Sequence, residues 1–88
     1  MHITVLSPEE SVFHGVANAV VVPAFDGKVG ILPRHAPFLT LLGDGPLTVR
    51  TDDGTKTFRV RGGFLQVVDD TVRVVAEYVE AGESDVAT

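Results

Sequence analysis

The chain has 88 residues, no cysteine, and 7 basic against 12 acidic residues, which gives a net charge of −5. One domain of this length buries only about 60 to 65% of the surface that its unfolded chain exposes, so its core is thin. Without disulfides or thiolate metal sites, stability must come from sheet pairing, aliphatic packing or a partner, and a reducing compartment fits. The acidic balance argues against nucleic-acid binding.

The longest continuous apolar run, residues 19–25, is far shorter than a membrane-spanning helix. Met1 is followed by no basic and apolar signal segment. We therefore expect a soluble chain that is not exported.

Residues 2–7 alternate weakly between apolar and polar side chains, which indicates a strand. The next segment, Ser7-Pro8-Glu9-Glu10, has the form of a helix capping box with proline at the first helical position. Only residues 11–14 follow before Gly15, too few to support a helix, because helix nucleation is costly. We predict a turn that leads into a strand.

Residues 16–25 are too continuously apolar for a strand with one wet face, so we expect a central strand. The glycines of "DGKVG" and of "RGGF" lack the following Gly-Lys-Ser or Gly-Lys-Thr that a phosphate-binding loop requires. They are expected to be turn and bulge glycines.

The stretch "GILPRHAPFLT" places one histidine between two prolines. Pro33 and Pro37 fix their φ angles and remove two backbone donors, which makes the loop stiff. Such a loop can present Arg34 and His35 to a macromolecule at low entropic cost. Alternatively, His35 hydrogen-bonds the loop to itself, and composition alone leaves both hypotheses open.

Residues 47–61 are predicted to form a hairpin, because Asp53-Gly54 can supply the positive φ of a two-residue turn. Centring the turn there predicts two apolar and two polar cross-strand pairs: Val49–Phe58, Leu47–Val60, Thr48–Arg59 and Arg50–Thr57.

A second hairpin is predicted over residues 64–75 about Asp69-Asp70. The predicted pairs are Val67–Val72, Leu65–Val74 and Gln66–Arg73. Phe64 and Val75 then fall on the polar face, which suggests that the strand ends are partly covered on both sides.

Five or more short antiparallel strands, each with one buried face, are best satisfied by two sheets folded over one core. The predicted fold class is all-β, a small antiparallel β-sandwich. We expect the domain to occupy residues 1–80 and the acidic residues 81–88 to form a frayed tail.

Catalytic and metal chemistry find little support in the sequence. The candidate ligands or nucleophiles are three histidines and three serines: His2, His14, His35, Ser7, Ser11 and Ser84. The histidines stand far apart, whereas a metal site needs at least three converging ligands. The serines lie in no nucleophile elbow. The acids lie mostly in turns and the tail and are expected to be solvated.

One alternative function is a lipoyl-like or biotinyl-like carrier domain, which is also a compact all-β unit modified on a hairpin lysine. Lys28 and Lys56 are the candidates. Neither lies in the Met-Lys-Met or Asp-Lys-Ala setting that such domains show, and Lys56 alternates like an ordinary strand residue.

Four segments in order, "LSPEESVFHG", "VVVPAFDGKVGILPRHAPFLTLL", "GPLTVR" and "RGGFLQVVDDTVRVVAE", resemble the N-terminal domain of the epsilon subunit of the F-type ATP synthase. The resemblance runs from about Ile3 to Glu80, and its Gly-Ile-Leu-Pro-x-His-Ala-Pro core is very specific.

This resemblance implies a sandwich of about ten short strands in the central stalk, without a catalytic role, a metal or a cofactor. Its implied partners are the gamma subunit and the membrane ring of c subunits, with which it turns as a rotor. It would couple ion flow, such as proton transport, to ATP synthesis. The implied location is peripheral, at the cytoplasmic face of the energy-transducing membrane.

The resemblance also implies two contact surfaces. The residues matched to the c-ring contact are Asp26, Gly27, Lys28, Val29, Gly30, Arg34 and His35. The residues matched to the gamma contact are Ser7 and Thr40. Lys28 departs from the acid that many members carry in this loop, so the charge expected to face the ring is inverted.

Many members of the family continue into a C-terminal helical hairpin that can bind ATP. Nothing after Glu80 resembles it. Either this is a naturally short form or the chain was cut, and without the hairpin no direct ATP binding is expected.

Overall fold

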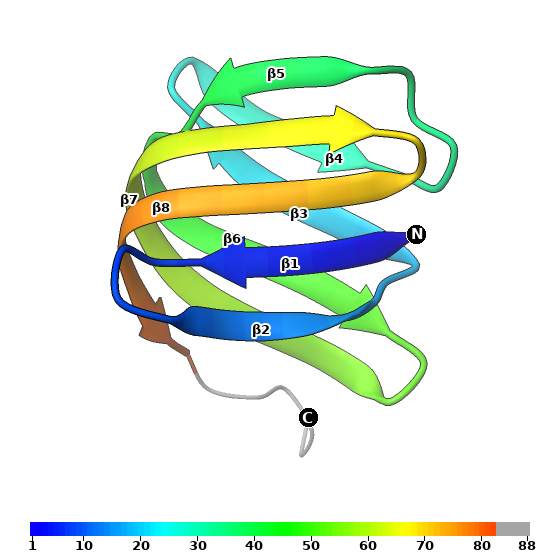
Figure 1. Ribbon diagram of the computed structural model, residues 1–88, viewed down its shortest axis with the longest axis horizontal. Coiled ribbons are helices and arrows are strands. Elements are labelled where there is room, and N and C mark those ends of the chain that lie inside the picture. The colour runs from blue at the N-terminus through cyan, green and yellow to red at the C-terminus, as the bar shows by residue number, and fades with distance from the viewer. Residues whose placement is uncertain (83–88) are drawn as a thin grey trace.

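The computed structural model describes residues 1–82, and within this range it contains eight β-strands and no helix, so none that could cross a membrane (Figure 1). The strands are β1 (His2–Leu6), β2 (Ser11–Val16), β3 (Ala19–Ala24), β4 (Gly27–Ile31), β5 (Phe38–Leu41), β6 (Asp44–Thr51), β7 (Gly54–Val68) and β8 (Thr71–Ala81). Residues 83–88 of the predicted tail, including Ser84, lie outside the described range.

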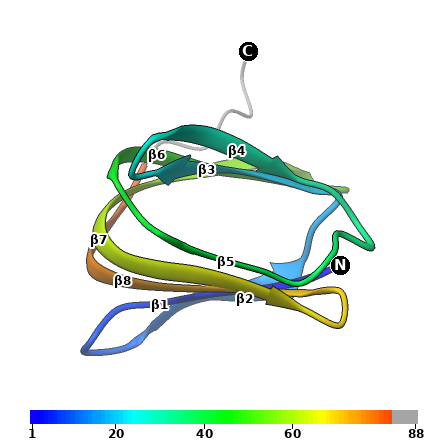
Figure 2. The same ribbon diagram turned by 90° about the horizontal axis from the view of Figure 1, so that it is seen from above.

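All eight strands belong to one sheet in the order β2-β1-β8-β7-β6-β3-β4, with β5 pairing with β7 outside this path. The sheet folds back on itself to form two layers, and Figure 2 shows β3, β4 and β6 in one layer and β1, β2, β5 and most of β8 in the other. The only parallel pair within residues 1–82 is β1 with β8. The predicted all-β sandwich is confirmed.

The strand count is eight rather than about ten, because β7 and β8 are long enough to enter both layers. The first half of β7 pairs with β6, and its second half pairs with β5. Between these halves, Gly62 and Gly63 have positive φ angles of 68° and 99°. A Cβ atom on Gly63 would overlap the carbonyl oxygen of Val75. The β7–β8 pairing keeps one register on both sides of these glycines, so the glycine pair marks a bend where the two backbones approach closely rather than a bulge.

The second predicted hairpin has the register derived from the sequence. β7 and β8 pair Val67 with Val72, Leu65 with Val74, and Gln66 with Arg73. Asp69 and Asp70 both have positive φ angles, 51° and 59°, as the two-residue turn requires.

The predicted register of the first hairpin is wrong by two residues. β6 and β7 pair Leu47 with Phe58 and Val49 with Lys56, so none of the four predicted pairs forms. The turn residues are Asp52 and Asp53, and Gly54 supplies its positive φ of 126° after the turn rather than within it. The shift keeps every side chain on its expected face, because it is an even number of residues.

A threonine explains this displaced turn. The hydroxyl of Thr51 accepts the N–H of Asp53 at 3.1 Å and donates to the carbonyl of Gly54 at 2.9 Å. This clamp holds the two aspartates between Thr51 and Gly54, which form the last pair of the ladder.

Two upstream predictions fare differently. The turn at Ser7 is confirmed: the N–H of Ser7 donates to the carbonyl of Glu10 at 2.9 Å, and β2 follows directly. β3 is flanked by β6 and β4, as expected for a central strand. Its second face is only partly covered, however, because Val21 is 38% exposed whereas Pro23 on the same face is buried.

The core between the layers is aliphatic, and among the described residues no buried polar side chain lacks a hydrogen bond. The largest fully buried side chains are Ile3, Ile31, Leu47, Leu65, Val5, Val20, Val22, Val49, Val60, Val67, Val72 and Val74. At one end of this core, the rings of Phe13 and Phe58 lie with their centroids 5.7 Å apart.

Asp70 ties three segments together at the β7–β8 turn. Its carboxylate accepts the backbone N–H of Arg34 at 2.8 Å and lies 3.6 Å from the amino group of Met1. Its backbone carbonyl accepts the N–H of His2 at 3.0 Å. The Arg34 hydrogen bond lowers the pKa of the Asp70 carboxyl, partial desolvation opposes the shift, and the positive charge at Met1 adds to the lowering.

Gly63→Ala is expected to destabilise the domain by about 3 kcal/mol or more, because the new methyl group meets backbone atoms and the φ angle disfavours a side chain. Gly30→Ala is the matched control, since a Cβ there meets nothing within 4 Å. Urea unfolding of both variants measures the difference. Equal stability of the two variants would contradict this account of the close approach between β7 and β8.

Asp70→Asn is expected to make the free energy of unfolding depend less on pH in the acid range. The folded-state pKa of Asp70 is lowered, so its ionised form stabilises the fold above its unfolded pKa of about 3.9. This contribution disappears as the pH falls through the folded pKa. The wild type should therefore lose more stability below about pH 4 than Asp70→Asn does. Urea unfolding between neutral and acid pH checks this, with Asp26→Asn in another turn as control. Parallel profiles for wild type and Asp70→Asn would refute it.

Candidate functional site

The outer face of the layer formed by β5, β7, β8 and β1 carries an unusual row of apolar side chains. Residues opposite one another on paired strands share a face of the sheet. The registers align four outward residues, which we call the apolar stripe: Leu41, Phe64, Val75 and Leu6. The adjacent outward row begins with Leu39 on β5 and continues with three polar residues. We call these three the polar row: Gln66, Arg73 and Thr4.

Two of the three apolar side chains of β5 point in the unexpected direction, while Phe38 packs against the core. Leu39 and Leu41 are 66% and 62% exposed, whereas Thr40 between them is half-buried. A strand covering a core normally shows the opposite alternation. Phe64 on β7 is also exposed, at 38%. Contiguous exposed apolar side chains of this kind mark interaction surfaces.

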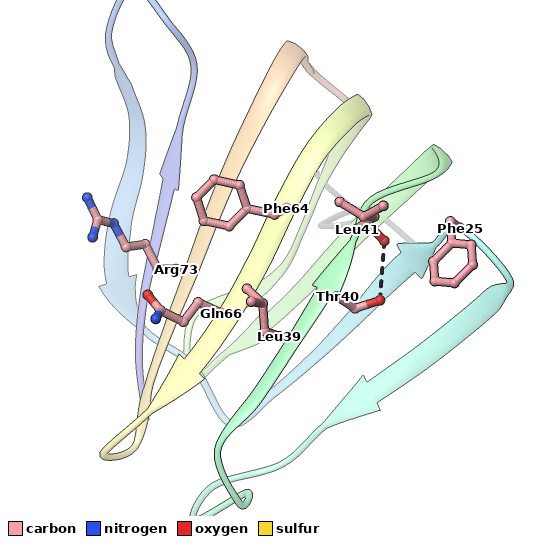
Figure 3. A pocket seen from close by; sticks show the side chains of 7 residues that line it. All are labelled: Phe25, Leu39, Thr40, Leu41, Phe64, Gln66 and Arg73. Carbon is pink, nitrogen blue, oxygen red and sulfur yellow. Dashed lines mark hydrogen bonds between the residues drawn. The ribbon is translucent and has the colours of Figure 1, made fainter.

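These side chains line an open groove of about 710 Å³ (Figure 3). Its lining residues are Phe25, Leu39, Thr40, Leu41, Phe64, Gln66 and Arg73. Figure 3 shows Arg73 at one side of the groove and Phe25 at the other. The lining contains one cation and no carboxylate, so the site suits an apolar ligand surface rather than acid–base chemistry.

The two residues matched to the gamma contact lie at opposite ends of the apolar stripe. Thr40 directly precedes Leu41 on β5 and lines the groove. Ser7 directly follows Leu6, and its hydroxyl takes part in the β1–β2 turn through the N–H of Glu10 at 3.3 Å. The structure thus places both residues next to the stripe, although the half-buried Thr40 side chain points away from the face that carries Leu39 and Leu41.

The residues matched to the c-ring contact are divided by the structure. Asp26 lies in the β3–β4 turn beside Phe25, whose N–H donates to the Leu41 carbonyl at 3.1 Å. Residues 27–30 continue along β4, the edge strand of its layer. Arg34 and His35 lie beyond the other end of β4, where Arg34 bonds the β7–β8 turn. The set therefore spans the whole length of β4 rather than one compact patch.

His35 makes contacts within its own loop. Its Nδ1 lies 2.7 Å from the carbonyl oxygen of Ala36, which can only accept, so Nδ1 carries the proton. Its backbone N–H donates to the carbonyl of Leu32 at 3.2 Å. Its half-buried ring lies 5.6 Å from the ring of Phe38. These contacts favour the hypothesis that His35 holds the loop together.

The two candidate carrier lysines lie within strands. Lys28 pairs with Pro23 in the β3–β4 ladder. Lys56 pairs with Val49, and its ammonium lies 5.8 Å from the centre of the Phe13 ring. Neither lysine occupies a hairpin turn, so the geometry does not favour a carrier domain.

Sequence reasoning missed most of the groove, including Phe25, Leu39, Leu41 and Arg73. The one available signal was the apolar pair Phe64–Val75 on the otherwise polar face of its hairpin. That pair is the centre of the apolar stripe.

A family model described as the ATP synthase delta/epsilon chain, beta-sandwich domain, matches residues 1–82. The ATP synthase epsilon chain of Micrococcus luteus is 40% identical and aligns over 99% of this chain and 97% of its own length. That of Caulobacter vibrioides is 38% identical, over 92% and 95% respectively. That of Synechococcus sp. WH7803 is 44% identical, over 91% of this chain and 59% of its own length. The chain thus spans about three fifths of some relatives and nearly all of others.

Two solved structures share the fold. One is a chain of the Euglena gracilis mitochondrial ATP synthase, solved with OSCP, F1 and c-ring, with a TM-score of 0.83 and 21% identity. The other belongs to the central stalk and c-ring of the Tetrahymena thermophila enzyme, with a TM-score of 0.76 and 19% identity. Each covers 90% of this chain, which in turn covers 51% and 64% of theirs.

His35→Ala is expected to destabilise the isolated domain by about 1 kcal/mol, because it removes a hydrogen bond and a half-buried ring contact. His2→Ala, at an exposed histidine, should stay within about 0.5 kcal/mol of wild type. Urea titrations of the three proteins provide the comparison. A His35→Ala domain as stable as wild type would instead favour a presented contact residue.

Proposed function

The chain belongs to the ATP synthase epsilon chain family, and from this premise we propose that it is a non-catalytic rotor subunit of the F-type enzyme. In this role it links the gamma subunit to the membrane ring of c subunits. Rotation of the three together couples ion flow to ATP synthesis. No residue of the chain takes part in the chemistry of ATP.

The observation that carries this proposal is the apolar stripe. An isolated domain gains nothing from holding Leu41 and Phe64 in water, whereas an interface with gamma removes them from it. The two residues matched to the gamma contact, Ser7 and Thr40, lie at the ends of this stripe. We therefore assign the outer face of β5, β7, β8 and β1 to gamma.

The contact with the c ring is assigned to the remaining matched residues, centred on β4. Gly27, Lys28 and Gly30 are exposed along this edge strand. Lys28 brings a positive charge to the edge of an acidic chain, so the matching ring surface would carry an acid or contact mainly the backbone. The subunit would then be held at the cytoplasmic face of the membrane through protein contacts.

Leu41→Asp is expected to leave the domain folded and to weaken its binding to purified gamma subunit at least about 30-fold, because a charge replaces an exposed apolar anchor of the interface. Leu41 is 62% exposed, so the fold loses little packing. Calorimetric titration measures binding, and urea unfolding measures stability.

Leu32→Asp is a closely matched control, since Leu32 is also 62% exposed but lies in the loop after β4. It should bind gamma like wild type. If Leu41→Asp binds gamma as tightly as Leu32→Asp does, the stripe is not the gamma contact.

A further inference from the structure

Arg73 is the one charged side chain in the two outward rows, and nothing described in this domain neutralises it. Its cross-strand neighbours are Gln66 on β7 and Thr4 on β1, both uncharged. Within residues 1–82, no carboxylate lies within 4.0 Å of its guanidinium. By contrast, Arg59 and Arg61 share Asp44 at 3.1 and 3.7 Å.

The position of Arg73 makes this absence of a partner consequential. It lines the groove together with Phe64 and Leu39, so any surface that covers these apolar side chains also removes water from the guanidinium. A charge that loses its water without gaining a counter-charge opposes binding. A tight partner must therefore supply an acceptor at this point, and a carboxylate matches the guanidinium best.

The shape of the surface indicates what kind of segment carries that carboxylate. The stripe is a sheet face, and β7, β8 and β1 beneath it have a paired strand on both sides, so a segment that crosses them covers side chains rather than adding a strand; only β5 has a free edge. Neighbouring strands are about 4.8 Å apart and one helical turn rises about 5.4 Å, so a helix laid along the stripe meets roughly one strand per turn.

We propose that the apolar stripe binds an amphipathic helix of the gamma subunit that places an aspartate or glutamate beside Arg73. This inference rests on the proposed function, because it takes gamma as the partner. The helix covers Leu41, Phe64, Val75 and Leu6 with its apolar side. The acid stands on the flank of the helix that faces the polar row.

A second copy of the chain does not meet the same requirement. The apolar stripe and the polar row contain no carboxylate, so two copies facing each other through them leave both guanidinium groups unpaired. The net charge of −5 also opposes association of two copies.

The test titrates purified gamma subunit into the full chain and its Arg73 variants by calorimetry. Arg73→Gln should bind about tenfold more weakly and Arg73→Glu at least about 30-fold more weakly, whereas Arg73→Lys should stay within about threefold. Arg50→Glu makes the same charge change at an exposed position on β6 in the other layer, and it should bind like wild type. Raising the NaCl concentration should weaken wild-type binding more than Arg73→Gln binding.

Further arms separate this inference from the proposed function. If Leu41→Asp loses binding while Arg73→Glu binds like Arg50→Glu, gamma uses the stripe but the acid partner is wrong. If Leu41→Asp also binds normally, the gamma assignment itself fails. Self-association on size exclusion that Leu41→Asp abolishes would make a second copy the occupant and overturn the inference. A gamma variant with the matching acid changed to lysine should bind Arg73→Glu more tightly than it binds the wild-type chain. If no acid-to-lysine variant of gamma does so, the inference is also overturned.

Discussion

The close approach of β7 and β8 at Gly62 and Gly63 is the constraint on which the rest of the structure depends. One continuous sheet becomes a sandwich only if its longest strands can enter both layers, and β7 does so across this bend. A side chain at Gly63 would overlap the neighbouring backbone, so the strands could not keep their spacing. The Gly63 carbonyl also accepts the N–H of Leu42 at 3.0 Å, which fixes the end of β5 against the bend.

The same constraint positions the interaction surface. Phe64 follows the glycine pair directly, and its partners Leu41 and Val75 lie on the strands to either side. The apolar stripe therefore lies next to the point where β7 passes from one layer to the other. A surface built on three paired strands next to this bend is held by their backbone hydrogen bonds, so a partner that binds there orders few side chains.

The sequence was sufficient for the fold where two local signals agreed. In the β7–β8 hairpin, the turn aspartates and the alternating valines both specify one register, and the structure shows the same register. In the β6–β7 hairpin, Asp53-Gly54 was the stronger turn signal, but the hydroxyl of Thr51 clamps Asp52-Asp53 instead. The groove escaped prediction because β5 reverses the usual alternation, and only the pairing of β5 with β7 reveals which of its faces is wet.

That reversal explains how a domain with a thin core can carry an exposed apolar face. The valines and isoleucines between the layers fill the interior without help from Leu39 or Leu41. Turning these leucines outward therefore removes little from the stability of the isolated domain, while it supplies an anchor for a partner. The chain's net charge of −5 opposes contact between two such faces in solution. Arg73 adds selectivity, because a partner with an apolar surface but no matching acid would leave the Arg73 guanidinium desolvated and unpaired.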